Sequence, residues 1–208
     1  MRGRRPSPDS VDSRLFAIIR SRGRGSVFVA AEFLWIGSRM AVDQALHRMA
    51  GKGIIRRLDR GLYDFPKVHP VQGPILPSAE TVVRAIAGRT RTRTRLQPAG
   101  AYAANTLGLS KQVPTKLVFL TDGPTRNVKL GTRTIQLRRT TAKNMATAGR
   151  LSGLLIQALR ELGIDTITPK QRAYLIRTLS ANKRRELIKD LKLAPVWMHE
   201  IFRELAAK

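Results

Sequence analysis

The residues best suited to chemistry are polar side chains that share one face of a predicted helix beginning after Gly37. If Val42, Leu46 and Met49 face a core, a rotation of about 100° per residue places the other positions on the opposite side. Glutamine can pair with adenine edges and arginine with guanine edges in the major groove of DNA. The pattern therefore predicts a base-contacting face. Its central and flanking members are Arg39, Met40, Asp43, Gln44, His47 and Arg48.

More basic residues follow this helix, on a segment predicted to form a hairpin. β-Branched and aromatic residues flank the stretch DRG (59–61), which is typical of a strand, a tight turn and a returning strand. On or near this hairpin, Arg56, Arg57 and Arg60 can grip backbone phosphates or enter a minor groove. Ser38 is placed to cap the helix, where it and the first amide groups can meet a phosphate.

Three helices and the hairpin must position these side chains. An apolar stripe predicts a first helix capped by Ser7, Asp9 or Ser10, and a second, short helix covers residues 28–36. The third helix starts at Ser38 and is stopped by glycines 51 and 53. This order predicts a winged helix-turn-helix over residues 1–70.

Charge supports a polyanionic partner. The 208 residues include 39 Lys and Arg against 14 Asp and Glu, a formal net charge of +25. Each phosphate that a basic residue neutralises releases counterions and adds affinity, so nucleic acid is the leading class of partner. The alternative is that the polar face and the arginines are merely solvated.

A second domain is predicted over residues 71–145, after a linker over 65–77 that contains four prolines. It has a helix between Ser78 and Gly88, a short helix around 99–107, and three strands of which the last two meet at Gly131. The expected fold is α+β with a mainly antiparallel sheet. Apolar stripes predict that residues 146–208 form a helical C-terminal region.

A row of arginines alternates with threonines at the start of the second domain. Period-two alternation suits a strand with a basic face. Three roles stay open: a second phosphate-binding surface, a site for an acidic partner protein, or a solvated edge that discourages strand pairing. The row consists of Arg89, Arg91, Arg93 and Arg95.

Enzymatic activity is not expected. Residues 71–145 contain only Glu80 and Asp122 as acids and no histidine, too few for metal-dependent cleavage. Zero cysteines exclude disulfides and thiolate zinc sites, so we expect neither a metal nor a cofactor. The longest apolar runs fall short of the roughly 20 residues of a membrane span, and the N-terminus lacks an apolar signal core. The expected location is the cytoplasm.

The stretch GSRMAVDQALHRMAGKGIIRRLDRGLYDFP, Gly37 to Pro66, resembles the N-terminal winged helix of the AbiEi family, antitoxins of abortive-infection type IV toxin–antitoxin systems. The resemblance continues through Ile75 to Thr140, which is similar to the C-terminal domain of those proteins. It implies a repressor that binds inverted repeats in its own promoter. It also implies an antitoxin paired with a nucleotidyltransferase-like toxin.

Two functional hypotheses follow. The first is a sequence-specific repressor and antitoxin that binds double-stranded DNA. The second is a basic interaction protein that holds RNA or an acidic protein without reading DNA sequence. Whether the chain forms a homodimer on DNA is left open, although a two-fold dimer would suit an inverted repeat. The amino-acid sequence does not indicate which operator the protein would bind or how it would neutralise a toxin.

Overall fold

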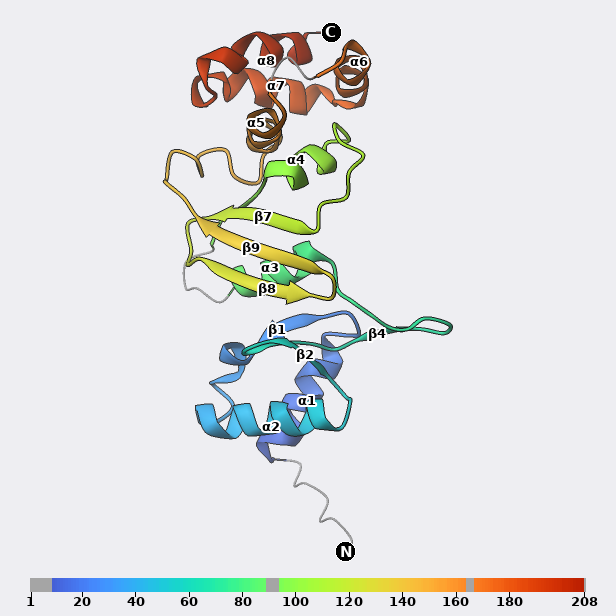
Figure 1. Ribbon diagram of the computed structural model, residues 1–208. Helices are drawn as coiled ribbons and strands as arrows, with labels where there is room; N and C mark the ends of the chain where they lie inside the picture. Colours follow the sequence, from blue (N-terminus) through green and yellow to red (C-terminus); the bar gives the residue numbers. More distant parts are fainter. Residues whose placement is uncertain (1–8, 89–93, 164–166, 208) are drawn as a thin grey trace, which may run out of the picture. The chain divides into compact units, whose positions relative to one another are not determined.

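The computed structural model describes residues 9–88, 94–163 and 167–207 (Figure 1). The chain is a mixed α+β protein, as predicted, and divides into two compact units. The first comprises the described residues of Met1–Arg93 together with Val128–Gly131, and the second comprises those of Thr94–Asn127 and Thr132–Lys208. The predicted domain boundaries at residues 70 and 145 stay a prediction.

Local signals define most elements of the first unit. Ser10 and Ser38 cap the two long helices, each accepting a hydrogen bond from an amide three residues on. The elements are α1 (Val11–Ser21), β1 (Val27–Val29), η1 (Ala30–Phe33), α2 (Arg39–Gly51), β2 (Arg56–Asp59), β3 (Leu62–Asp64), β4 (Lys67–His69), β5 (Gly73–Ile75) and α3 (Ala79–Ala87).

The short helix predicted over 28–36 is wrong. Residues 27–29 form strand β1, which pairs antiparallel with β3 and places Phe28 opposite Tyr63, and only a 3₁₀ turn follows. A short apolar run does not reveal by periodicity alone whether it is helix or strand. The resulting sheet has the order β1-β3-β2.

One apolar core joins α1, η1 and α2 to this sheet, and α3 packs on β1. Its buried members come from both helices and from the strands, so the faces of α1 and α2 that point inward are fixed. The buried residues of this core are Leu15, Ile19, Phe28, Ala30, Phe33, Ile36, Val42, Ala45, Leu46, Met49, Ile55, Tyr63 and Phe65.

The segment predicted as a linker contains a hairpin instead. Strands β4 and β5 pair antiparallel, with Lys67 opposite Ile75 and His69 opposite Gly73. Figure 1 shows this hairpin projecting from the rest of the first unit. The prolines in this segment argue against strands, because proline has no N–H to donate to a neighbouring strand. In a two-stranded hairpin both strands are edge strands, where proline is tolerated.

Among its described residues, the second unit combines a sheet with five α-helices and two 3₁₀ helices. Its elements, with the shared strand β8, are β6 (Leu96–Ala99), α4 (Gly100–Thr106), β7 (Lys116–Thr121), β8 (Arg126–Leu130), β9 (Arg133–Arg139), α5 (Leu151–Leu162), α6 (Pro169–Thr178), α7 (Ala181–Lys189), η3 (Leu191–Leu193), η4 (Val196–Met198) and α8 (His199–Ala206).

The sheet order is β6-β7-β9-β8. Strands β6 and β7 are antiparallel, but β7 and β9 are parallel, so the sheet departs in part from the antiparallel pattern expected. The parallel pair arises because β9 returns between β7 and β8, and strand patterns alone do not encode that order.

Helices α4 to α8 share the main apolar core of the second unit. Glycine is needed beside it at position 153, where an added Cβ would lie 2.3 Å from the carbonyl oxygen of Thr147. The buried members are Ala103, Ala104, Leu109, Leu155, Ile156, Ala158, Leu159, Ile167, Leu175, Leu179, Leu187, Ala194, Met198, Ile201, Phe202 and Leu205.

Candidate nucleic-acid interface

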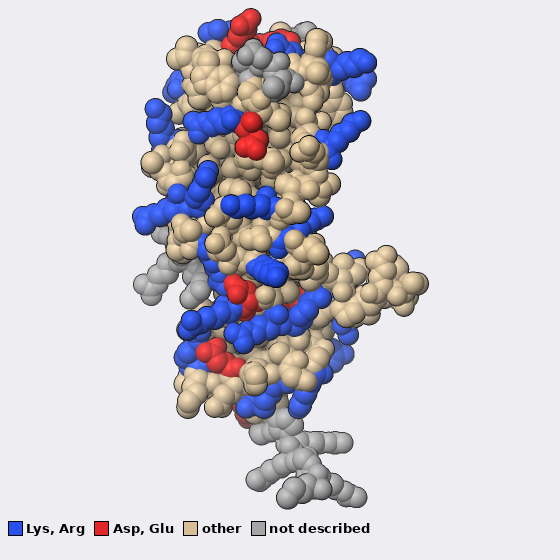
Figure 2. Space-filling view, in the orientation of Figure 1, with Lys and Arg blue, Asp and Glu red and all other residues tan. Residues whose placement is uncertain are grey.

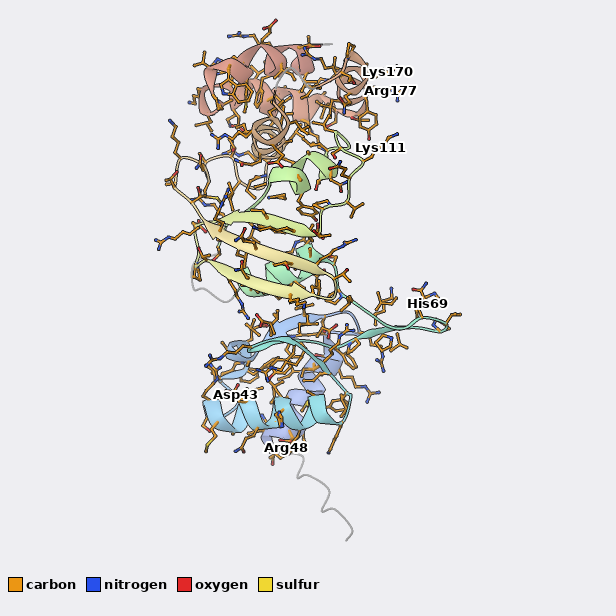
Figure 3. The ribbon with its side chains drawn as sticks, viewed as in Figure 1. Asp43, Arg48, His69, Lys111, Lys170 and Arg177 are labelled. Carbon is orange, nitrogen blue, oxygen red and sulfur yellow. The ribbon has the colours of Figure 1, made fainter. Side chains whose placement is uncertain are left out.

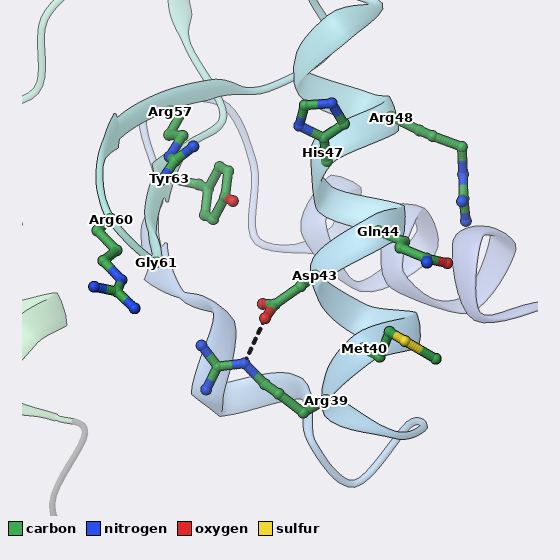
Figure 4. Close-up of a pocket in the computed structure, with 10 residues that line it drawn as sticks. All are labelled: Arg39, Met40, Asp43, Gln44, His47, Arg48, Arg57, Arg60, Gly61 and Tyr63. Atoms are coloured by element: carbon green, nitrogen blue, oxygen red, sulfur yellow. Dashed lines mark hydrogen bonds and ion pairs between the residues drawn. The ribbon is translucent and has the colours of Figure 1, made fainter.

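A groove lies between α2 and the β2–β3 hairpin (Figure 4). It encloses about 760 Å³ and gathers eight of the ten residues that the sequence predicted to contact DNA. Two further residues, Gly61 and Tyr63, were not predicted. The lining consists of Arg39, Met40, Asp43, Gln44, His47, Arg48, Arg57, Arg60, Gly61 and Tyr63.

The packing of α2 creates this polar face. Val42, Ala45, Leu46 and Met49 are buried, so the intervening residues must face outward. Arg39, Gln44, His47 and Arg48 are exposed, as is Met40 at 70%. In Figure 4, Arg39 and Asp43 point toward the hairpin, whereas Gln44 and Arg48 point away from it. The helix therefore offers side chains of several lengths and chemistries to one partner surface.

Both arginines on α2 have carboxylate partners. The Arg39 Nε lies 2.7 Å from an oxygen of Asp43, one turn further along the helix. The Arg48 Nε lies 2.9 Å from Asp12 on α1, and its Nη2 contacts the other carboxylate oxygen. Hydrogen bonds from Arg48 lower the pKa of Asp12, and the same bonds raise the pKa of Arg48. These pairs orient both guanidinium groups, which stay half-exposed at the surface.

The hairpin contributes two basic residues, Arg57 and Arg60, and one aromatic residue, Tyr63, to the lining of the groove. Arg57 is exposed on β2, opposite Tyr63 on β3, and Arg60 stands in the turn. Gly61 has a φ of +68°, which the turn requires and which other residues adopt only with strain. Tyr63 is nearly buried and stacks on Phe28 at 6.2 Å between ring centroids. It therefore ties the hairpin to the core.

Sequence reasoning missed Tyr63 and Gly61 as parts of the groove. The predicted hairpin was the signal that could have found Tyr63. Pairing of its two strands places Tyr63 opposite Arg57, which was already a predicted site residue.

Two predicted residues do not line the groove. Ser38 caps α2, and its side-chain oxygen accepts from the amide of Ala41 at 3.3 Å. Arg56 forms two hydrogen bonds to Asp64, a carboxylate that is only 1% exposed, and a third to the carbonyl of Ile75 at 2.8 Å. Its guanidinium thus joins β2 and β3 to β5. Arg56 is therefore engaged within the fold and not at the groove.

Of the arginine row in the second domain, Arg89, Arg91 and Arg93 lie outside the described residues. Arg95 is exposed, and its Nε lies 2.9 Å from a carboxylate oxygen of Asp122. Its backbone amide donates to the same carboxylate, and its Nη1 donates to the carbonyl of Met145. Hydrogen bonds from the Arg95 side chain lower the pKa of Asp122. Arg95 thereby fastens the start of β6 to the end of β7.

Metal ligands are not clustered in the part of the chain that the structure describes, where no three His, Asp or Glu side chains could hold an ion. Among the described helices, none has the length and apolar character needed to cross a membrane.

A family model described as a family of unknown function, DUF6088, matches residues 14–187. The match covers the groove and most of the second unit. No curated protein matches the chain.

Proposed function

The chain belongs to DUF6088, a family of unknown function, and we propose that it binds double-stranded DNA sequence-specifically through a winged helix-turn-helix in its first unit. The observation that carries this proposal is the groove between α2 and the β2–β3 hairpin, where an exposed polar helix face adjoins arginines on a hairpin.

The dimensions and chemistry of α2 suit a DNA major groove. That groove admits one α-helix, whose exposed side chains then meet base edges. Gln44 can make paired hydrogen bonds to adenine, and Arg39 or Arg48 can do so to guanine. Asp43 can accept from the amino group of cytosine and is repelled by phosphates, so it disfavours unspecific approach. Met40 offers an apolar contact for a thymine methyl group.

The hairpin supplies the positioning contacts. Arg57 is exposed at the groove, and no ion-pair partner for it is found among the residues described. It is therefore ready to neutralise a backbone phosphate, a contact that adds affinity without sequence preference. Arg60 adjoins it in the turn.

The proposed target is the upstream DNA of the chain's own gene, with repression as the outcome. This step, and the further role of an antitoxin against a nucleotidyltransferase-like toxin, rest on the resemblance to the AbiEi family. Co-expression with a toxin of that class encoded next to this chain tests the antitoxin role. Growth rescue by this chain is expected, and unrelieved toxicity would contradict it.

Quantitative binding to the upstream DNA and to a scrambled duplex of equal length, over a salt series, tests the DNA proposal. We expect a preference of about a thousandfold near physiological salt. Gln44→Ala should reduce that preference by about tenfold, since one paired contact to a base discriminates by about 1–3 kcal/mol. Arg57→Ala should weaken both duplexes equally and lower the slope of log affinity against log salt by about 0.9.

Arg20→Ala is the matched control, because Arg20 is exposed on α1 and does not line the groove. Equal binding of both duplexes by the unmodified protein, or an effect of Arg20→Ala as large as that of Arg57→Ala, would contradict the proposal.

A further inference from the structure

A second basic surface lies on α6 in the second unit. Lys170, Tyr174 and Arg177 are exposed, and their spacing of i, i+4 and i+7 places them on one face of the helix. Two cations thus flank an aromatic ring that is 45% exposed. Together with Lys111, these residues are called the α6 basic face.

Specific contacts bring Lys111 to this face. The side-chain amide of Gln171 on α6 donates to the carbonyl of Leu109 at 2.8 Å. Gly108 has a φ of +72°, and a Cβ added to it would lie 3.4 Å from the Tyr174 ring. The loop that carries Lys111 is therefore packed beside α6. Figure 3 shows Lys111, Lys170 and Arg177 on the same side of the unit.

A side chain from α4 also holds the conformation of this loop. The side-chain amide of Asn105, on α4, donates to the carbonyl oxygens of Ser110 and Gln112, at 3.1 and 3.0 Å. Lys111 lies between these two anchored residues and is itself exposed. Its position beside α6 is set by the surrounding backbone rather than by its own charge.

Carboxylates are scarce in the described segments that carry these cations. Neither residues 108–115 nor 167–178 contain Asp or Glu. Arg172, the other cation of α6, is paired with Glu204 at 2.8 Å. By contrast, no ion-pair partner for Lys111, Lys170 or Arg177 occurs within the ranges that the structure describes. Lys and Arg also predominate over Asp and Glu on the visible face in Figure 2.

Unpaired cations around an exposed ring suit a nucleic-acid strand. Lys170 and Arg177 are about 10.5 Å apart along the helix axis, by a rise of 1.5 Å per residue. That distance allows them to meet different phosphates of one strand. Tyr174, between them, can stack on a base, and only an unpaired base presents its flat side. A duplex would leave the ring unused.

We propose that the α6 basic face binds single-stranded nucleic acid, with phosphates on Lys111, Lys170 and Arg177 and a base stacked on Tyr174. The site shares no residue with the α2 groove. It is therefore a second binding activity that stands independently of the DNA-binding function proposed above.

The test uses the full chain and three fluorescein-labelled probes: oligo(dT), oligo(U) and a random-sequence duplex of equal length. Fluorescence anisotropy over a salt series gives affinity and salt slope. The charge variant is K111Q/K170Q/R177Q. The matched control, K183Q/K189Q/K192Q, removes the same charge from exposed positions of α7 and η3 in the same unit. Thermal melting confirms that both variants fold.

For the charge variant, the salt slope on single strands should fall by about 2, since each phosphate contact contributes about 0.7. The control should change that slope by less than about 0.7, the value of one contact. Tyr174→Leu should weaken single-strand binding by at least about fivefold, whereas Tyr174→Phe, which keeps the ring, should retain it. Neither change at Tyr174 should alter duplex binding.

Equal losses for the charge variant and its control would overturn the proposal, because charge alone would then explain binding. A loss on the duplex as large as that on single strands would also overturn it. Gln44→Ala and Arg57→Ala separate the two proposals. If Gln44→Ala leaves the preference for the upstream duplex unchanged and Arg57→Ala leaves duplex affinity unchanged, while the charge variant loses single strands, the α2 proposal fails and this one stands.

Discussion

Helices α2 and α5 have similar lengths, but the first backbone amides of the two helices find their hydrogen-bond acceptors in different places. Helix α2 starts at its own cap, Ser38, and buries one apolar face. Helix α5 has no side-chain cap of its own, and the amides of Leu151 and Ser152 donate to Glu186 on α7. It also buries the polar side chains of Ser152 and Gln157.

This difference separates sites for recognition from sites for stability. A helix that satisfies its own first amides needs only one face for packing, and its other face stays available to a partner. A helix whose polar groups are satisfied by another helix becomes part of the core. Substitutions on the exposed face of α2 should therefore change binding, whereas those at the start of α5 should change the free energy of unfolding.

The largest effect is expected for Asp190→Ala. Asp190 is 2% exposed, accepts from the Ser152 hydroxyl at 2.5 Å and forms an ion pair with Arg150. Its removal leaves a buried hydroxyl and an arginine without their acceptor, which should lower the free energy of unfolding by about 2–4 kcal/mol. Urea unfolding in a Trp35→Phe background, followed by Trp197 fluorescence, measures this change in the second unit.

Asp43→Ala in the α2 groove is the matched control for Asp190→Ala. It should change the free energy of unfolding by less than about 0.5 kcal/mol, as is usual for surface substitutions. Equal effects of the two variants would remove the contrast between the helices.

A smaller effect is expected for Gly153→Ala. The new methyl would lie 2.3 Å from the Thr147 carbonyl oxygen and 2.5 Å from the Gln97 side-chain oxygen. Such overpacking should cost about 1–3 kcal/mol. Gly51→Ala on α2, where nothing lies within 4 Å, should instead stabilise by about 0.5–1 kcal/mol. Chemical denaturation of both variants checks the opposite signs, and stabilisation by both would show that α5 has room at Gly153.

The smallest effect concerns pH and the Asp12–Arg48 pair. Hydrogen bonds from Arg48 lower the pKa of Asp12 in the folded state, so the pair stabilises above the unfolded pKa of about 4 and is lost as pH falls through the folded pKa. Arg48 is 50% exposed, and solvent screening limits the contribution to a few tenths of a kcal/mol. Urea unfolding at pH 3–7, followed by Trp35 in a Trp197→Phe background, should show a weaker acid destabilisation for Asp12→Asn. Identical pH dependence in the two proteins would contradict this.

Sequence alone located the elements that depend on local signals. Ser38 and Ser78 cap helices at the predicted starts, and Ser10 is the one of three candidate residues that caps α1, because a cap needs only its own side chain and the next amides. The strand β1 and the β4–β5 hairpin were missed, since a strand is defined by its partner. The parallel pairing of β7 with β9 was missed for the same reason.

The candidate site shows the same limit. Rotation along α2 predicted its exposed residues, because that face follows from the helix period and the apolar positions. The partners of Arg48 and Arg56 could not be predicted, since Asp12 lies 36 residues away and Asp64 lies across a strand pair. Such contacts hold the Arg56 guanidinium within the fold, whereas the neighbouring Arg57 lines the groove.

The apolar core of the first unit and the main core of the second unit are also completed at different points along the sequence. Every member of the first lies between Leu15 and Phe65, whereas the second joins Ala103 to Leu205. During synthesis from the N-terminus, the first core can therefore assemble while the ribosome is still adding the residues of the second. A nascent chain would carry the α2 groove in finished form before its own translation ended. The DNA binding that we propose for this groove would then be open to the chain while it is still attached to its messenger.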